Sequence, residues 1–195
     1  MRLFIAVPVS EEARRALSEI QSALAARLPD WRWSKPENLH LTLAFLGETK
    51  PEKIPLIEDV IRRNCASVFT FDIGFGGLGA FPSARDPRVI YLGCSRGEKE
   101  LSLLAQKLIP NLSSAGLVPD AEMNRTFRAH LTLARRPPGL ARQKAAADLK
   151  SIIGEESARP SIASPAGAVV LYESRPSASG SEYRPLFRLG LDKQA

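Results

Sequence analysis

Runs and alternations of apolar residues divide the chain into short strands and amphipathic helices. Strands are predicted at 2–9, 38–47, 68–73, 127–134, 168–173 and 183–191, with a hairpin formed by 78–81 and 89–94. Apolar residues at helical spacing predict one helix between Ser10 and Pro29 and others at 51–64, 98–112 and 139–153. Ser10, followed by two glutamates, is a typical helix N-cap. This mixture predicts an α+β fold.

The order of these elements repeats along the chain. The tetrapeptide HLTL occupies residues 40–43 and 130–133, an offset of 90. RLFIAVPVSEEARRAL from Arg2 resembles RVIYLGCSRGEKELSLL from Arg88, and both are typical of a strand followed by a helix. We therefore expect a single bilobal domain over 1–195 that arose by internal duplication. Its two pseudo-symmetric lobes of antiparallel sheet would carry helices outside and leave an active-site cleft between them.

Both histidines of the chain stand in this tetrapeptide. Because side chains alternate along a strand, the leucines of each copy should face the core. The opposite faces are predicted to carry His40, Thr42 and Ala44 in the first copy and His130, Thr132 and Ala134 in the second. A lone histidine on an amphipathic strand is commonly just a satisfied polar residue. Packing alone, however, can repeat the leucines without repeating His and Thr, so the duplication favours a catalytic role.

Two imidazoles and two hydroxyls that converge in one cleft suit chemistry on a phosphodiester. Histidine titrates near neutrality, so one ring can act as a base while the other acts as an acid. Threonine hydroxyls can donate hydrogen bonds to the non-bridging phosphate oxygens. Residues alone do not say which histidine takes which role, because their pseudo-symmetry hides the difference.

Charge supports a polyanionic substrate. The chain has a formal net charge of +6 and a pI near 9.6. Five arginines crowd around the second histidine, namely Arg125, Arg128, Arg135, Arg136 and Arg142. Cys65 and Cys94 make no disulfide framework, which fits a cytoplasmic protein. No apolar run is long enough to span a bilayer, so no membrane partner is expected.

Other kinds of site fit the sequence less well. Two histidines cannot complete a zinc sphere, and no acidic cluster lies beside either of them, so we expect no metal and no cofactor. A Ser-His-Asp triad would leave one histidine unexplained. The glycine-rich GFGGLGAF lacks the Lys-Ser/Thr ending of a P-loop, and a bulged hairpin accounts for its glycines.

These motifs resemble those of the 2H phosphoesterase superfamily, whose signature is a pair of H-x-T/S-x motifs. The chain is most similar to the bacterial and archaeal RNA 2′,3′-cyclic phosphodiesterases, historically named 2′-5′ RNA ligases. The resemblance runs over RLFIAVPVSEEARRAL, WSKPENLHLTLAFLGE, FRAHLTLAR and VVLYESRPSASGSEYRPLFRL. It implies a bilobal fold, no metal requirement, and hydrolysis of an RNA 2′,3′-cyclic phosphate to a 2′-phosphomonoester.

The resemblance also assigns roles. It implies that His40 is the proton donor and His130 the proton acceptor, and that Thr42, Thr132 and Arg135 bind the phosphate. Strict alternation places Arg135 on the leucine side, so it reaches the phosphate only if the strand ends or bulges there. Otherwise Arg135 is a solvated arginine at a strand end.

Two further positions qualify this assignment. Phe45 holds the equivalent place to Arg135 in the first copy, where it could stack on a nucleobase or simply pack in the core. Relatives often have proline before the second histidine, where this chain has Ala129.

Two alternatives stay open for the function. If the same groups catalysed the reverse reaction, the protein would be a 2′-5′ RNA ligase. Alternatively, the protein could bind RNA ends that carry a cyclic phosphate without catalysing any reaction. In each case the partner is RNA or a nucleotide with a 2′,3′-cyclic phosphate. No obligate protein partner is expected, and the chain should be a monomer.

Overall fold

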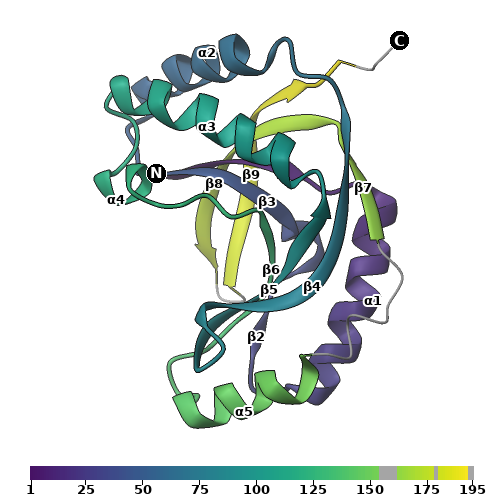
Figure 1. Cartoon of the computed structure of the whole chain (residues 1–195). Helices are drawn as coiled ribbons and strands as arrows, with labels where there is room; N and C mark the ends of the chain where they lie inside the picture. Colours follow the sequence, from purple (N-terminus) through teal and green to yellow (C-terminus); the bar gives the residue numbers. More distant parts are fainter. Residues whose placement is uncertain (154–161, 178–179, 193–195) are drawn as a thin grey trace.

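The computed structural model describes residues 1–153, 162–177 and 180–192 (Figure 1). Its strands are β1 (Arg2–Pro8), β2 (Arg32–Trp33), β3 (His40–Glu48), β4 (Phe71–Ser83), β5 (Asp86–Arg96), β6 (His130–Arg135), β7 (Ile162–Ala166), β8 (Ala168–Ser177) and β9 (Gly180–Gly190). Its helices are α1 (Glu11–Arg27), α2 (Ile54–Cys65), α3 (Glu98–Ser114), α4 (Asp120–Met123) and α5 (Arg142–Ile152), with 3-10 turns at Pro36–Asn38 and Pro51–Lys53.

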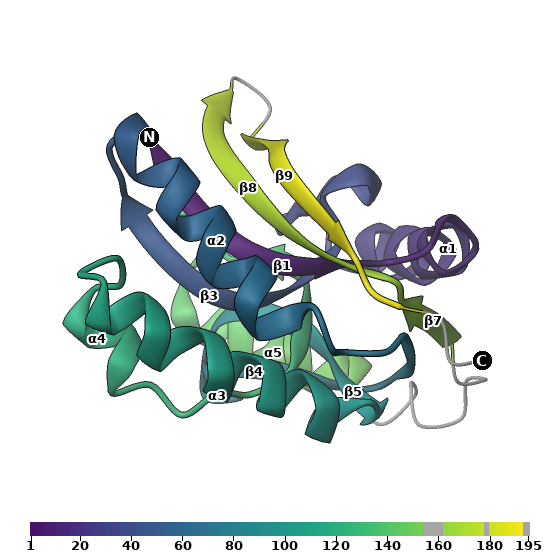
Figure 2. The ribbon, with the colours of Figure 1, turned by 90° about the horizontal axis from the view of Figure 1, so that it is seen from above.

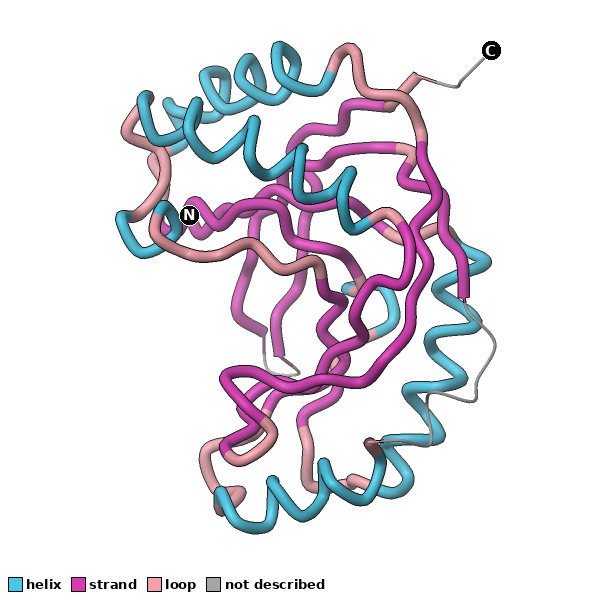
Figure 3. The backbone as a smooth tube through the Cα atoms, in the orientation of Figure 1, coloured by secondary structure: helices cyan, strands magenta, loops and turns pink. Residues whose placement is uncertain are grey.

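The strands form one curled sheet at the centre of the molecule, and the helices lie at its periphery (Figure 3). The strand order is β7-β4-β5-β6-β3-β1-β8-β9, all pairs are antiparallel, and the short β2 pairs with β6. Helices α2 and α3 lie side by side (Figure 2), while α1 and α5 lie at the other end of the molecule. The α+β prediction is confirmed.

One hydrophobic core joins the helices to the sheet. The buried leucines of β3 and β6 belong to the same cluster as the apolar faces of α1, α2, α3 and α5. Leu41 and Leu131 are 1 % and 0 % exposed, as the alternation of HLTL predicts. The leucines therefore fix each motif strand to the core and leave the opposite side chains available.

The sheet has two four-stranded halves, β7-β4-β5-β6 and β3-β1-β8-β9. They join through β3 and β6, whose register contains the single pair Leu41↔Leu131. The halves are not continuous in sequence. β4, which follows the first motif, pairs with β5 in the second half, and β8, which follows the second motif, pairs with β1 in the first. Each half of the sheet is therefore built from strands of both halves of the sequence.

Most of the predicted helices and strands are present, but some begin or end at other residues than predicted. The predicted strands at 68–73 and 78–81 are parts of the single strand β4, whose pairing with β5 shifts register between Gly76 and Leu78. Gly77 has a φ of 72°, a left-handed conformation that favours glycine, so the predicted bulged hairpin is confirmed. β6 starts at His130 rather than 127. Helix α5 starts at Arg142 rather than 139, because the residues just before it form a turn in which the Leu140 N–H donates to the Pro137 carbonyl at 3.2 Å. β2 and α4 were not predicted, since they have only two and four residues, and β7 was not predicted, since its sequence IASPA contains a proline and mostly small residues.

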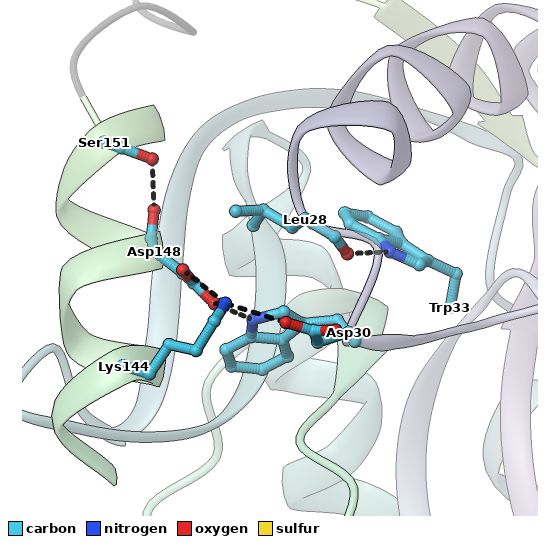
Figure 4. A network of polar contacts seen from close by, with 7 residues as sticks. Leu28, Asp30, Trp33, Lys144, Asp148 and Ser151 are labelled. Carbon is cyan, nitrogen blue, oxygen red and sulfur yellow. Dashed lines mark hydrogen bonds and ion pairs between the residues drawn. The ribbon is translucent and has the colours of Figure 1, made fainter. Parts of the chain in front are cut away.

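A polar network ties α5 to the segment that leads into β2 (Figure 4). Lys144 pairs with Asp30 at 2.8 Å and with Asp148 at 3.2 Å. The Trp31 indole donates to Asp148 at 3.1 Å. Because β2 itself pairs with β6, this network anchors a segment that lies directly beside the second motif.

Candidate active site

A cavity of about 480 Å³ lies where the two halves of the sheet meet. It is lined by both motif histidines, both motif threonines, Arg135 and Phe45, and also by Arg2, Leu3, Phe4, Ser34, Asn38, Gly47, Ser174, Ser181 and Tyr183. All six residues singled out from the sequence therefore meet in one place.

The pairing of β3 with β6 explains this convergence. The register Leu41↔Leu131 sets His40 opposite Thr132 and Thr42 opposite His130, on the face away from the leucines. The two histidines are thus diagonal neighbours, which in an antiparallel pair lie roughly 7–8 Å apart. All four side chains therefore line the same cavity.

A bulge interrupts both motif strands at the same residue. The pairing of β1 with β3 passes from Thr42 to Ala44 and leaves out Leu43, and the pairing of β5 with β6 likewise leaves out Leu133. One extra residue reverses the alternation beyond it. Ala44 and Ala134 were expected beside the histidines, but both are fully buried on the core side. That expectation was wrong.

The same bulges decide where the next residue of each motif lies. Phe45 and Arg135 come to the side of the histidines, and both line the cavity. Arg135 is exposed, and Phe45 is 38 % exposed. The bulge that Arg135 needed in order to reach the cavity is therefore present, and Phe45 lies at the rim rather than in the core.

Two side chains that the sequence did not point to stabilise the bulge in β6. The Leu133 carbonyl accepts a hydrogen bond from the Ser34 N–H at 2.8 Å and another from the Gln21 amide at 3.0 Å. The same amide nitrogen donates to the Ser34 carbonyl at 2.7 Å, and the Ser34 hydroxyl donates to the Thr132 carbonyl at 3.2 Å. Gln21 is only 5 % exposed. The sequence did hold one signal for this role: Gln21 is a polar residue on the buried face of α1, among an alanine and leucines.

Backbone carbonyls orient both imidazoles in the same way. His40 Nδ1 lies 2.6 Å from the Asn38 carbonyl oxygen, and His130 Nδ1 lies 2.7 Å from that of Arg128. A carbonyl only accepts, so each Nδ1 carries the proton and each neutral ring keeps its lone pair on Nε2. His40 Nε2 is 3.1 Å from the Thr42 hydroxyl. Nε2 is therefore the atom of each ring that can take up or give a proton.

Aromatic side chains pack against both imidazoles. His40 lies 4.9 Å from Phe4 and 5.2 Å from Tyr183, measured between ring centroids. His130 lies 4.8 Å from Phe81 and 5.5 Å from Tyr91. In each half, two aromatic rings from neighbouring strands stack on each other beside the histidine: Phe4 on Tyr172, and Phe81 on Tyr91. These contacts were not predicted. The Phe81–Tyr91 pair lies within the predicted hairpin, but the contacts with the two histidines join strands far apart in the sequence.

This environment keeps both rings neutral at neutral pH. Burial lowers the pKa of His40 to about 4, and Arg135 and His130 act in the same direction, against the Asn38 carbonyl. Burial also lowers the pKa of His130, helped by Arg125, Arg135 and Arg128. The positive charges that depress both pKa values would attract an anion, and a bound anion would raise them again.

Comparison with known proteins places the chain in a family. Its residues 7–91 match the family model described as LigT like Phosphoesterase. It is 38 % identical over 135 residues to an RNA 2′,3′-cyclic phosphodiesterase of Archaeoglobus fulgidus, covering 69 % of this chain and 72 % of the relative. The chain belongs to the LigT-like 2H phosphoesterases. A second relative with the same description, from Methanothermobacter thermautotrophicus, is 34 % identical over 155 residues and matches 80 % of this chain and 79 % of its own length.

Solved structures agree with this membership in the LigT-like family. A protein of Thermus thermophilus covers both chains completely with a TM-score of 0.78 at 27 % identity. Escherichia coli LigT complexed with 3′-AMP covers 97 % of both chains with a TM-score of 0.73 at 25 % identity. The resemblance inferred from the two motifs is confirmed, and so is the assignment to phosphodiester-cleaving relatives.

Within the described residues, no group of three or more His, Cys, Asp or Glu side chains is arranged to hold a metal ion. Over the same part of the chain, no helix has the length and apolar character to cross a membrane.

Proposed function

We propose that the protein hydrolyses the 2′,3′-cyclic phosphodiester at the end of an RNA to a 2′-phosphomonoester. The observation that carries this proposal is the convergence of two imidazoles, two threonine hydroxyls and Arg135 on one cavity. The relatives described as RNA 2′,3′-cyclic phosphodiesterases support the same substrate. The complex of Escherichia coli LigT with 3′-AMP supports recognition of a nucleotide.

His130 would act as the base and His40 as the acid. Nε2 of His130 takes a proton from a water molecule as the water oxygen forms a bond to phosphorus. The bond between phosphorus and the ribose 3′ oxygen breaks, and that oxygen takes a proton from Nε2 of His40. The phosphate stays on the 2′ oxygen. Direct transfer of the proton from His130 to His40, or exchange with solvent, restores the starting state. This assignment follows the family resemblance.

Thr42, Thr132 and Arg135 would hold the phosphate during this reaction. The hydroxyls donate to the non-bridging oxygens, and the guanidinium meets the negative charge that grows on them. Because an anion raises the pKa of His40 from about 4, substrate binding would itself load the acid with its proton. Phe45, at the rim of the cavity, would offer a face for a nucleobase.

We further interpret the two halves of the sheet as lobes related by a pseudo-two-fold axis between β3 and β6. In each half a motif strand lies at the junction, and the next strand outward leads into a helix. All proposed site residues come from one chain, so a monomer would suffice, acting as a single domain. A cytoplasmic location would keep Cys65 and Cys94 reduced and give access to RNA.

The direct test is incubation with an oligonucleotide that ends in a 2′,3′-cyclic phosphate, in the presence of EDTA. We expect hydrolysis to continue, with mass analysis and 2′- or 3′-specific digestion placing the phosphate on the 2′ oxygen. Loss of activity in EDTA would contradict the metal-independent mechanism. A 3′-phosphate product would contradict the roles of the two histidines. A parallel reaction with added 5′-hydroxyl RNA reports any ligated 2′-5′ product, whose dominance would instead favour the ligase.

A further inference from the structure

A second cavity of about 650 Å³ opens from the candidate active site. The two cavities share Phe45, His130, Thr132 and Arg135. Beyond these shared residues, the second cavity is lined by Phe81, Pro82, Arg88, Val89, Arg125, Thr126 and Arg128. It therefore adds three arginines and an aromatic ring, and none of its lining residues is acidic.

Arginines and aromatic rings are paired in this second cavity. The guanidinium of Arg125 lies 5.7 Å from the centroid of the Phe45 ring, and that of Arg128 lies 5.8 Å from the centroid of the Phe81 ring. Proteins that bind single-stranded nucleic acid combine these two features: cations that contact the backbone and flat rings on which bases stack.

The two arginines differ in how they are held. Arg125 pairs with Glu122 at 3.6 Å, and the same carboxylate accepts the Phe45 N–H at 3.2 Å. This arrangement fixes Arg125 beside Phe45. Arg128 is exposed and has no carboxylate partner among the residues that the structure describes. By contrast, Arg136, on the same stretch of chain, pairs with Asp86 at 2.8 Å. The charge of Arg128 is thus available to an anion from outside.

We propose that the second cavity binds the nucleotide next to the cyclic end, so that the preferred substrate is single-stranded RNA rather than a mononucleotide. Arg125 and Arg128 contact the backbone phosphates, and Phe45 and Phe81 contact the bases. This inference rests on the proposed function, because it places the cyclic phosphate in the adjoining cavity. An acidic peptide could use the cations, but it would not need the flat rings beside them or the continuity with the catalytic histidines.

The test compares two substrates, a mononucleoside 2′,3′-cyclic phosphate and a hexanucleotide with the same cyclic end. The variants are Arg125→Ala, Arg128→Ala and the double variant. Arg62→Ala is the matched control, since Arg62 is also an exposed arginine over an aromatic ring, 4.5 Å from Phe187 on another face. Rates are compared at the pH optimum of each variant, because Arg125 and Arg128 lower the pKa of His130.

For the wild type we expect kcat/KM to be at least tenfold higher for the hexanucleotide than for the mononucleotide. The double variant should lose most of that difference, and its kcat/KM for the hexanucleotide should depend less steeply on salt. Loss of two phosphate contacts would reduce the log–log slope by about 1.4 for a single strand. Arg62→Ala should leave both substrates unchanged. Equal losses on both substrates, or no length preference in the wild type, would overturn the inference.

A binding measurement separates this inference from the proposed function. Fluorescence anisotropy with a labelled hexanucleotide that ends in a 2′-phosphate needs no turnover. If the wild type binds this strand and the double variant binds at least tenfold more weakly, the RNA subsite stands even when neither cyclic substrate is hydrolysed. If the mononucleotide is hydrolysed but the double variant binds the hexanucleotide as tightly as the wild type does, the inference fails and the proposed function stands.

Discussion

At the scale of single residues, the two histidines occupy matching environments. Each donates from Nδ1 to the carbonyl of the residue two positions earlier and packs against aromatic rings from neighbouring strands. A histidine whose only role was to complete its own hydrogen bonds would not need a second histidine in the same environment. The repeated orientation leaves the Nε2 atom of each ring turned away from the backbone carbonyl, which is what the proposed proton transfers require.

Removal of either imidazole should therefore strongly lower kcat. We expect His40→Ala and His130→Ala each to lower kcat by roughly 10²- to 10⁴-fold, the usual contribution of a positioned acid or base. Steady-state kinetics with the cyclic-phosphate oligonucleotide measures this, and circular dichroism checks that the variants are folded. A loss below tenfold for either variant would contradict its role.

The low pKa of the half-buried His40 also makes stability depend on pH. Its pKa is about 4 in the folded protein and near 6.5 when unfolded, so the unfolded chain binds more protons between these values. The free energy of unfolding should therefore fall as pH drops below about 7, by about 2 kcal/mol between pH 7 and pH 5 from this group. Urea unfolding of wild type and His40→Asn at both pH values measures it. An equal pH dependence in the variant would refute the assignment.

At the scale of elements, the bulges in β3 and β6 turn Phe45 and Arg135 to the cavity. The bulge in β6 leaves the Leu133 carbonyl outside the ladder with β5, where Ser34 and Gln21 donate to it. Buried donors of this kind are costly to remove. We infer that Gln21 positions Arg135 through this carbonyl, without touching the substrate.

The variant Gln21→Met keeps the volume and removes the donor. We expect it to lower the free energy of unfolding by about 1–2 kcal/mol and to raise KM more than it lowers kcat. In an Arg135→Ala background the same change should have little further effect on kcat/KM. Gln106→Met, on an exposed position of α3, is the control. Additive losses of kcat/KM in the double variant would show that Gln21 is only structural.

At the scale of the whole molecule, the candidate active site lies where the two halves of the sheet join through a single register pair. The halves share one register pair there, and the cavity opens on the face away from the leucines. The second cavity continues from it along β5 and the loop that carries Arg125 and Arg128. A chain end bound at the junction would therefore have a basic path leading away from it.

The sequence by itself determined most of the strands and helices, the buried leucines and the identity of the histidines and threonines. Those features follow from local periods of two and 3.6 residues and from a repeated tetrapeptide. Such patterns can be read from the sequence without knowing which distant segments are in contact. It also indicated that Arg135 needed a bulge, although it could not say that one exists.

Only the tertiary structure decided the bulges, the exchange of β4 and β8 between the halves and the aromatic packing around each histidine. A bulge depends on which strand lies alongside and on donors such as Gln21, more than a hundred residues from the carbonyl it satisfies. The low pKa of His40 likewise arises from burial by rings on three other strands. Such effects belong to contacts between distant segments, and no local pattern of the chain encodes them.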